Sequence, residues 1–288
     1  MPNSQARRRL CAAALLAAAG APVWAAPTTP PALTAPAATP PSERQVALVI
    51  GNSSYAVGAL KNPVNDARAV AAALGELGFE VVLRENTSLR DLIETFRQFS
   101  ISARSARVRV VFYAGHGVQV KGRNYLLPVD TEIRAEDEVP NKSADLNELL
   151  DRLGTMQQGI NIVILDACRN NPFSGAVIVG PDGRRLKFRG ATPAGLARVD
   201  APLGSMVAFS TAPGGVALDN PGEKNSLYTK HLLSSIQAPG LPVEMLFKQV
   251  RLAVARETGR VQVPWESSSL TGDFCFRLGP QGVCSVAR

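Results

Sequence analysis

A histidine and a cysteine, two residue types that can act together in covalent catalysis, each follow a short apolar run. His116 lies in the motif AGHG after the run VRVVFY, and Cys168 lies in the motif DAC after the run INIVIL. A cysteine thiolate can attack a carbonyl carbon, and a histidine can manage the proton of the leaving amine. If the two runs are neighbouring strands of a parallel sheet, both side chains reach one substrate at the edge where such sheets form ligand crevices.

Backbone donors for a developing oxyanion are available at the same two turns. Glycines on both sides of His116 let the backbone approach a substrate closely, and the N–H groups of Gly117 and Cys168 are candidates for an oxyanion hole. Taken singly, Cys168 would be a small buried apolar residue and His116 a turn residue. Their paired placement at two strand ends favours the catalytic interpretation.

The segments that would position these residues alternate between strand and helix. Apolar runs predict strands over 45–50, 79–84, 107–113, 160–165, 205–209 and 274–278, and a hairpin over 118–129. Helical periodicity predicts helices over 62–77, 89–104, 145–153, 226–236 and 243–257. The alternation indicates right-handed crossovers and a mostly parallel α/β sheet. Residues 174–202, rich in Gly, Pro and Arg, are expected to form a long exposed loop.

The first 43 residues are expected to lie outside the folded domain. A basic start with Arg7, Arg8 and Arg9, followed by an apolar run, predicts an export signal over 1–26, with an uncut membrane anchor as the alternative. The general and twin-arginine export routes both remain open. Residues 27–43, rich in Pro, Ala and Thr, predict a spacer, and 44–288 the folded domain. We therefore expect a periplasmic or secreted protein with no stable membrane span after signal removal.

Composition and charge exclude several classes of function. The 288 residues are 45% hydrophobic, which supports a sizeable core and excludes global disorder. The net charge of +7 falls to +4 without the signal, because that segment holds three arginines and no acid. The remaining basic residues form no stripe interleaved with aromatic residues, so we expect no nucleic-acid partner.

The other cysteines and the second histidine have simpler interpretations. Cys11 leaves with the signal, and the oxidising compartment beyond predicts a disulfide between Cys275 and Cys284, with two reduced thiols as the alternative. His231 lies in the middle of a predicted helix and is interpreted as structural. No cluster of His and Cys has metal-ligand spacing, and no nucleotide-binding fingerprint is present, so neither a metal nor another cofactor is expected.

Seven stretches between Arg44 and Phe276 resemble bacterial metacaspase-like or orthocaspase-type peptidases of the caspase superfamily. They are RQVALVIGNSSY, LKNPVNDARAVAAAL, VVFYAGHGVQVKGRNYLLPVD, VILDACRNNPF, GSMVAFSTAPGGVALD, NSLYTKHLL and PWESSSLTGDF. The resemblance implies a caspase-type three-layer sandwich with a six-stranded, mostly parallel sheet. It also implies a His116 and Cys168 dyad, and a large-subunit-like part up to about 173 joined through 174–202 to a small-subunit-like part from about 203.

The residue two places before the nucleophile indicates the specificity. Caspases proper carry a neutral Gln there and cut after Asp, whereas this chain carries Asp166, as metacaspases do, which implies cutting after Arg or Lys. An anion beside the nucleophile pairs with a basic side chain and repels an acidic one. Asp219 could line the same pocket or cap a turn, and Trp265 could wall a substrate subsite or belong to the core.

The sequence thus predicts a cysteine endopeptidase whose partners are proteins or peptides with Arg or Lys before the scissile bond. One alternative is a catalytically vestigial caspase-like module used for binding or scaffolding, and another is a cysteine transferase or ligase on the same fold. Calcium activation stays open, although no compact loop of alternating Asp and Asn ligands is present. Autoprocessing is expected in the long loop, which carries five basic residues: Arg184, Arg185, Lys187, Arg189 and Arg198.

Overall fold

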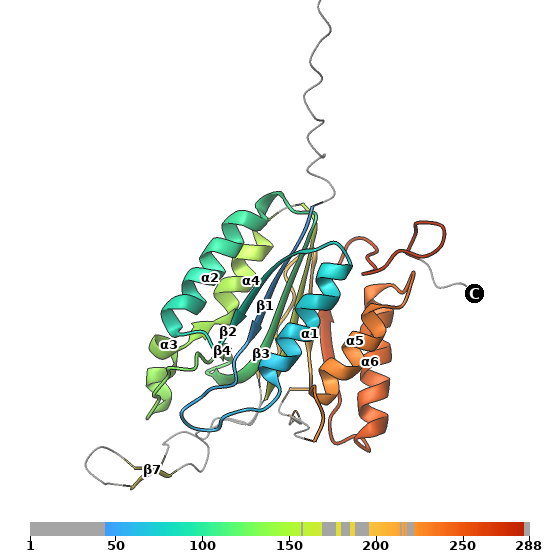
Figure 1. The fold of residues 1–288 in the computed structure, drawn as a ribbon. Coiled ribbons are helices and arrows are strands. Elements are labelled where there is room, and N and C mark those ends of the chain that lie inside the picture. Colours follow the sequence, from blue (N-terminus) through green and yellow to red (C-terminus); the bar gives the residue numbers. More distant parts are fainter. Residues whose placement is uncertain are drawn as a thin grey trace, which may run out of the picture. The chain divides into compact units, whose positions relative to one another are not determined.

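A twisted sheet with helices on both faces organises the chain (Figure 1). The structure is a computed structural model that describes residues 44–156, 158–168, 177–179, 185–187, 196–213, 215, 217 and 222–284. The central strands are β1 (Gln45–Gly51), β2 (Glu80–Glu85), β3 (Val108–Val120), β6 (Ile160–Cys168), β9 (Ser205–Phe209) and β10 (Trp265–Ser268). They lie in the order β10-β9-β6-β3-β1-β2, and β10 alone on this path is antiparallel to its neighbour. The six-stranded, mostly parallel sheet is therefore confirmed.

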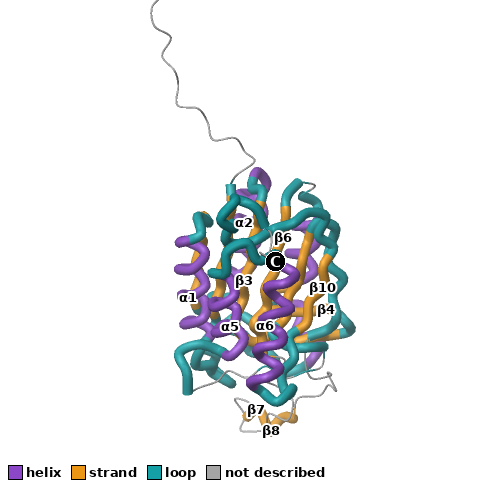
Figure 2. Tube along the Cα trace, turned by 90° about the vertical axis from the view of Figure 1, so that its right-hand side faces the viewer, coloured by secondary structure: helices purple, strands orange, loops and turns teal. Residues whose placement is uncertain are grey.

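Three helices cover one face of the sheet and two cover the other (Figures 1 and 2). The first set is α1 (Pro63–Glu76), α5 (Leu227–Ile236) and α6 (Val243–Glu257), and the second is α2 (Leu89–Ser102) and α4 (Leu146–Gly154). Strand alternation divides the core accordingly, because Phe112 and Ile164 pack in the cluster under α1, α5 and α6, whereas Tyr113 and Leu165 pack in the cluster under α2 and α4. None of the helices that the structure describes is long and apolar enough to cross a membrane.

Short polar residues start several of these helices. Ser88 accepts a hydrogen bond from Asp91 N at the start of α2, Asp145 accepts one from Asn147 N at the start of α4, and Ser226 accepts one from Thr229 N at the start of α5. Smaller elements complete the described residues: η2 (Ala103–Ser105), β4 (Arg123–Leu126), η3 (Glu136–Glu138), α3 (Val139–Lys142), β5 (Ala144–Asp145), and the antiparallel pair β7 (Val177–Val179) and β8 (Arg185–Lys187).

β3 is longer than the sequence predicts. Instead of ending at Tyr113, it continues through His116 to Val120 and turns into β4. Lys121 and Gly122 have φ angles of 50° and 79°, so they form the two-residue turn with positive φ that suits a tight hairpin. The predicted strand and hairpin are therefore one continuous element, and His116 lies within it.

The predicted strand over 274–278 is wrong. The last strand is β10, and residues 274–278 contribute one bridge, Pro239 to Arg277. The apolar alternation there arises because Phe274 and Phe276 both enter the core, with ring centroids 5.0 Å apart, and Phe276 also faces Phe79. The alternation of apolar residues at 274–278 therefore reflects two buried aromatic rings, and the segment does not pair as a strand of the sheet.

The exposed loop predicted over 174–202 needs correction at its end. Most of that loop lies outside the described residues. Its final part is held against the domain, since Leu196 and Val199 are buried beside α2 and α4. The side chain of Asn124 bonds both to Ala197 N, at 2.6 Å, and to Ala197 O, at 3.0 Å. Leu196 and Val199, three positions apart, are buried. Arg198, between them, and Asp200, after them, are exposed.

A disulfide joins Cys275 to Cys284, with Cα atoms 5.5 Å apart. Closing a loop of about ten residues stabilises a fold by about 2–3 kcal/mol, so Cys284→Ser should lower the melting temperature by about 5–10 °C. We choose Cys284 because Cys275 lies in the core. Thermal unfolding with and without dithiothreitol checks the expectation: the reductant should destabilise the wild type and leave Cys284→Ser unchanged. Equal melting temperatures for all four samples would contradict it.

Candidate active site

The two predicted catalytic residues face each other across neighbouring strands. β3 and β6 are parallel, and their register places His116, which lies within β3, directly opposite Cys168, the last residue of β6. Adjacent strands lie about 4.8 Å apart, so the two backbones are within reach of one reacting group. The position of the Cys168 side chain lies outside what the structure describes.

The imidazole of His116 is buried and oriented by one hydrogen bond. Its Nε2 atom lies 2.6 Å from the carbonyl oxygen of Gly58, and its ring lies against that of Tyr55 with centroids 4.4 Å apart. A carbonyl oxygen can only accept, so Nε2 carries the proton and donates. In the neutral ring Nδ1 is then the basic nitrogen, the one that can take and return a proton.

Two tyrosines hold the backbone of His116. The N–H of His116 donates to the hydroxyl of Tyr55 at 2.9 Å, and the hydroxyl of Tyr113 donates to the carbonyl of His116 at 2.8 Å. Gly115 has a φ of 154°, and a Cβ there would lie 2.6 Å from the Tyr55 hydroxyl and 2.8 Å from the Tyr113 hydroxyl. The glycine before His116 is thus required by these hydroxyls, which is a different reason from the substrate approach inferred from sequence.

Asp166 is a buried carboxylate on β6, two residues before Cys168. Its Oδ2 accepts hydrogen bonds from the hydroxyl of Thr229, at 2.8 Å, and from the hydroxyl of Ser226, both at the start of α5. Burial, and after it the negative charge of Asp166, raises the pKa of the neighbouring Tyr228 hydroxyl well above its usual value. The Asp166 carboxyl group therefore lies on the α1, α5 and α6 side of the sheet, at the start of α5.

A second buried carboxylate, Asp66, meets Asp166 at Ser226. Asp66 is 1% exposed, and its Oδ1 accepts from Asn225 Nδ2 at 2.8 Å and from Ser226 N at 3.0 Å. Ser226 thus contacts one acid through its backbone and the other through its hydroxyl. Sequence reasoning did not single out Asp66 as a site residue. Its place in the apolar row with Val70 and Leu74 was the signal that this acid is buried.

The remaining predicted site residues are distributed as follows. Gly117 follows His116 in β3, and Leu196 packs against it, since a Cβ at Gly117 would lie 3.0 Å from that side chain. Asp219 lies outside the described residues. Trp265 pairs with Phe209 at the carboxyl end of β9 and is 38% exposed, which suits a wall beside the site better than a core position. His231 Nε2 donates to Glu257 Oε2 at 2.8 Å on the outer side of α5 and α6, away from the dyad.

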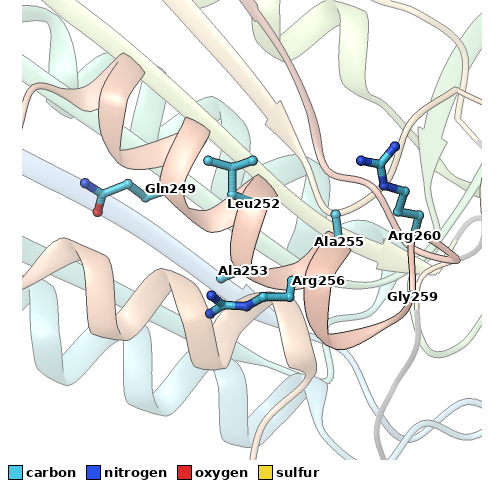
Figure 3. Close-up of a pocket in the computed structure, with 7 residues that line it drawn as sticks. All are labelled: Gln249, Leu252, Ala253, Ala255, Arg256, Gly259 and Arg260. Carbon is cyan, nitrogen blue, oxygen red and sulfur yellow. The ribbon is translucent and has the colours of Figure 1, made fainter.

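A separate hollow of about 770 Å³ runs along the outer side of α6 (Figure 3). Its lining residues are Gln249, Leu252, Ala253, Ala255, Arg256, Gly259 and Arg260. It includes neither His116 nor either buried carboxylate, so it is distinct from the dyad. In the part of the chain that the structure describes, no group of three or more His, Cys, Asp or Glu residues could hold a metal ion.

Fold and site together define a caspase-like α/β domain, and comparison with known proteins identifies its family. Residues 44–275 match the caspase domain family (Peptidase_C14), so the chain belongs to that family. Membership supports cysteine protease activity and protein substrates.

Individual relatives agree with this assignment. The mucosa-associated lymphoid tissue lymphoma translocation protein 1 homolog of Mus musculus is 28% identical over 131 residues, and its Homo sapiens counterpart is 27% identical over 131 residues. Each match covers 45% of this chain but only 15% and 16% of the relatives' own lengths. The fold is similar to caspase-1 from Spodoptera frugiperda, with a TM-score of 0.59, 18% identity, and coverage of 83% of this chain and 92% of that one.

Proposed function

We propose that this protein is a cysteine endopeptidase that hydrolyses peptide bonds after Arg or Lys, with His116 and Cys168 as its catalytic dyad. The observation that carries the proposal is the register of His116 opposite Cys168, beside two buried carboxylates that meet at Ser226. A protease of the caspase family needs the first arrangement for its chemistry. The second supplies a negative pocket for a basic side chain.

In the proposed reaction His116 Nδ1 takes the proton of the Cys168 thiol. The resulting thiolate attacks the scissile carbonyl carbon, and the carbonyl π electrons move onto oxygen. Collapse of this intermediate breaks the C–N bond, and the proton held on His116 Nδ1 passes to the leaving amine. Water then attacks the thioester with Nδ1 as the base, which releases the acid and restores the thiol. The bond from Nε2 to Gly58 O supports these roles because it keeps Nδ1 as the atom that gains and loses the proton.

Charge supports Arg or Lys as the residue before the cut. A guanidinium or ammonium that reaches Asp166 and Asp66 gains charge-assisted hydrogen bonds in a site sheltered from water, whereas an aspartate there meets like charge. Two acids on either side of Ser226 favour Arg over Lys, because the planar guanidinium can engage both.

We further propose that the protein is a bacterial, metacaspase-like or orthocaspase-type enzyme that acts in the periplasm or outside the cell. The support is the motif set from Arg44 to Phe276 and the export signal expected over 1–26. An oxidising compartment suits the Cys275–Cys284 disulfide. Cellular fractionation of the expressed full chain, with mass spectrometry of the mature N-terminus, tests the location.

A fluorogenic peptide panel tests the activity itself. The peptides differ only in the residue before the reporter group: Arg, Lys, citrulline, Gln or Asp, each measured with and without calcium. We expect hydrolysis of the Arg and Lys peptides and none of the Asp peptide. Absence of turnover together with absence of Cys168 labelling by a covalent Arg-based probe would instead favour a vestigial module, and transfer to an added amine would favour a transferase.

Self-processing is expected within residues 174–202. Arg184 and Arg189 lie outside the described residues, Arg185 and Lys187 belong to β8, and the Arg198 side chain is 70% exposed. Purified wild type should therefore separate into two fragments on a denaturing gel, while Cys168→Ala should remain one band. Mass spectrometry of the new termini should identify Arg or Lys before each cut. Identical bands for both proteins would refute self-processing.

A further inference from the structure

We infer that the hydroxyls of Tyr55 and Tyr113 form a clamp on the backbone of His116, and that Tyr113 is the positioning residue that aims the Gly117 N–H at the oxyanion. The inference rests on the proposed function and deepens it. It starts from the fact that both polar groups of the His116 backbone are bound by tyrosine hydroxyls.

The geometry of one peptide unit links Tyr113 to Gly117. The carbonyl of His116 and the N–H of Gly117 belong to the same planar trans peptide, so they point in opposite directions. The carbonyl points toward β4, where it accepts from Leu127 N at 3.0 Å. The Tyr113 hydroxyl has one proton and two carbonyl oxygens in reach, and that of His116, at 2.8 Å, is nearer than that of Leu127, at 3.0 Å. The Gly117 N–H therefore points to the other side, toward β6, where Cys168 is opposite His116.

Other hydrogen bonds confirm that the His116 carbonyl lies on the β1 and β4 side of β3. Asn52, directly after β1, donates through its backbone N–H to Ala114 O at 2.9 Å and through its side chain to Leu127 O at 3.1 Å. β1 and Leu127 thus lie on one side of β3, and β6 lies on the other. The two carbonyls of Ala114 and His116 share the first side, as expected for residues two apart in a strand.

Tyr55 couples the same peptide to the orientation of the imidazole. Its hydroxyl accepts from His116 N–H and lies 3.3 Å from the Tyr113 hydroxyl and 3.2 Å from Leu127 O. Three residues further along the chain, Gly58 presents the carbonyl that accepts from His116 Nε2. One loop therefore holds both the backbone and the ring of His116.

The environment keeps Tyr113 able to donate. Its side chain is fully buried, and burial together with the nearby Tyr55 hydroxyl raises its pKa well above the usual value, so it remains a protonated phenol throughout the pH range of catalysis. Gly115 leaves the space that both hydroxyls occupy. Removing only the hydroxyl, as in Tyr113→Phe, keeps the ring in the core and deletes the aiming bond.

The test compares Tyr113→Phe and Tyr55→Phe with Tyr125→Phe. Tyr125 is a buried tyrosine of the adjacent β4 whose hydroxyl makes no hydrogen bond to His116 or Gly117 in the described residues. We measure kcat and KM on an Arg peptide, the rate of Cys168 alkylation by iodoacetamide, and the melting temperature. Because alkylation forms no oxyanion, its rate measures the reactivity of the Cys168 thiolate and does not depend on the Gly117 N–H. Removing an interaction that is made only in the transition state lowers kcat and leaves KM unchanged.

We expect Tyr113→Phe to lower kcat by about tenfold to a hundredfold, with KM and the alkylation rate within about twofold of wild type. Tyr55→Phe should lower kcat as well, and Tyr125→Phe should change neither kcat nor alkylation. An unchanged kcat in folded Tyr113→Phe, or equal losses of kcat and alkylation, would overturn the inference and leave the proposed function intact. A wild type without turnover would reject the proposed function, and the inference with it.

Discussion

Cys168→Ala and His116→Ala should each lower the hydrolysis of Arg peptides by about 10⁴-fold or more, because nucleophile and proton carrier act as one unit. Without the thiol no acyl-enzyme can form, and without the imidazole the amine leaves unprotonated. The measurement is kcat/KM on a fluorogenic Arg peptide with purified, folded variants. His116 is buried and held by Gly58 and Tyr55, so His116→Gln is a second variant that disturbs packing less.

His231→Gln provides the matched control for the histidine. It removes the other histidine of the chain, which contacts Glu257 at the helix surface. This control should keep full activity, and circular dichroism should show the same fold for all variants. If either folded dyad variant retained activity within a few-fold of wild type, the assignment of the catalytic pair would be wrong.

Asp166→Asn and Asp66→Asn should each lower kcat/KM for Arg peptides by about a hundredfold. An amide can keep the hydrogen bonds that Asp166 accepts from Ser226 and Thr229, so the fold is retained while the charge is lost. Leaving a basic side chain without a carboxylate partner in a partly buried pocket costs several kcal/mol, and about 3 kcal/mol corresponds to roughly a hundredfold in rate. Kinetics on paired Arg and citrulline peptides isolates the charge, because citrulline keeps the shape of Arg and lacks its charge.

Asp151→Asn is the control for the loss of one negative charge, since Asp151 is exposed on α4, on the opposite face of the sheet. It should leave both the rate and the preference for Arg over citrulline unchanged. A wild type that prefers Asp peptides would contradict the acidic pocket. So would an Asp166→Asn variant that still prefers Arg over citrulline by the wild-type factor.

Local patterns in the sequence predicted most of the scaffold. The bounds predicted for β9 and α6 match the structure residue for residue, because a continuous apolar run and a regular helical row each depend on neighbours in sequence. The prediction that His116 and Cys168 follow buried apolar runs also needed only local information, although His116 lies within β3 rather than after its end. The sequence alone did not show that the two strands are neighbours. The pairing of β3 with β6 in the structure shows that they are.

Contacts between distant segments account for what the sequence did not reveal. Asp66 comes near Asp166 only because Asn225 and Ser226, about 160 residues later in the chain, donate hydrogen bonds to it. Leu196 was assigned to an exposed loop because its partner, Gly117, is far away in sequence. Likewise, the need for a glycine at 115 follows from the tyrosine hydroxyls. The hydrogen bond from His116 N–H to the Tyr55 hydroxyl joins residues 61 positions apart, a contact that no sequence periodicity indicates.

The order of the strands determines what a cut in the long loop does to the molecule. β9, from the second part of the chain, is hydrogen-bonded to β6, from the first part, and α5 packs with α1 in a shared core. A chain nicked between 169 and 195 thus becomes a two-polypeptide heterodimer that loses none of these pairings. It should elute as one species in gel filtration while giving two bands after denaturation. The hydrogen-bonded group at Ser226 is itself shared, since Asp66 and Asp166 come from one fragment and Ser226 from the other, so the proposed specificity would be a property of the reassembled pair.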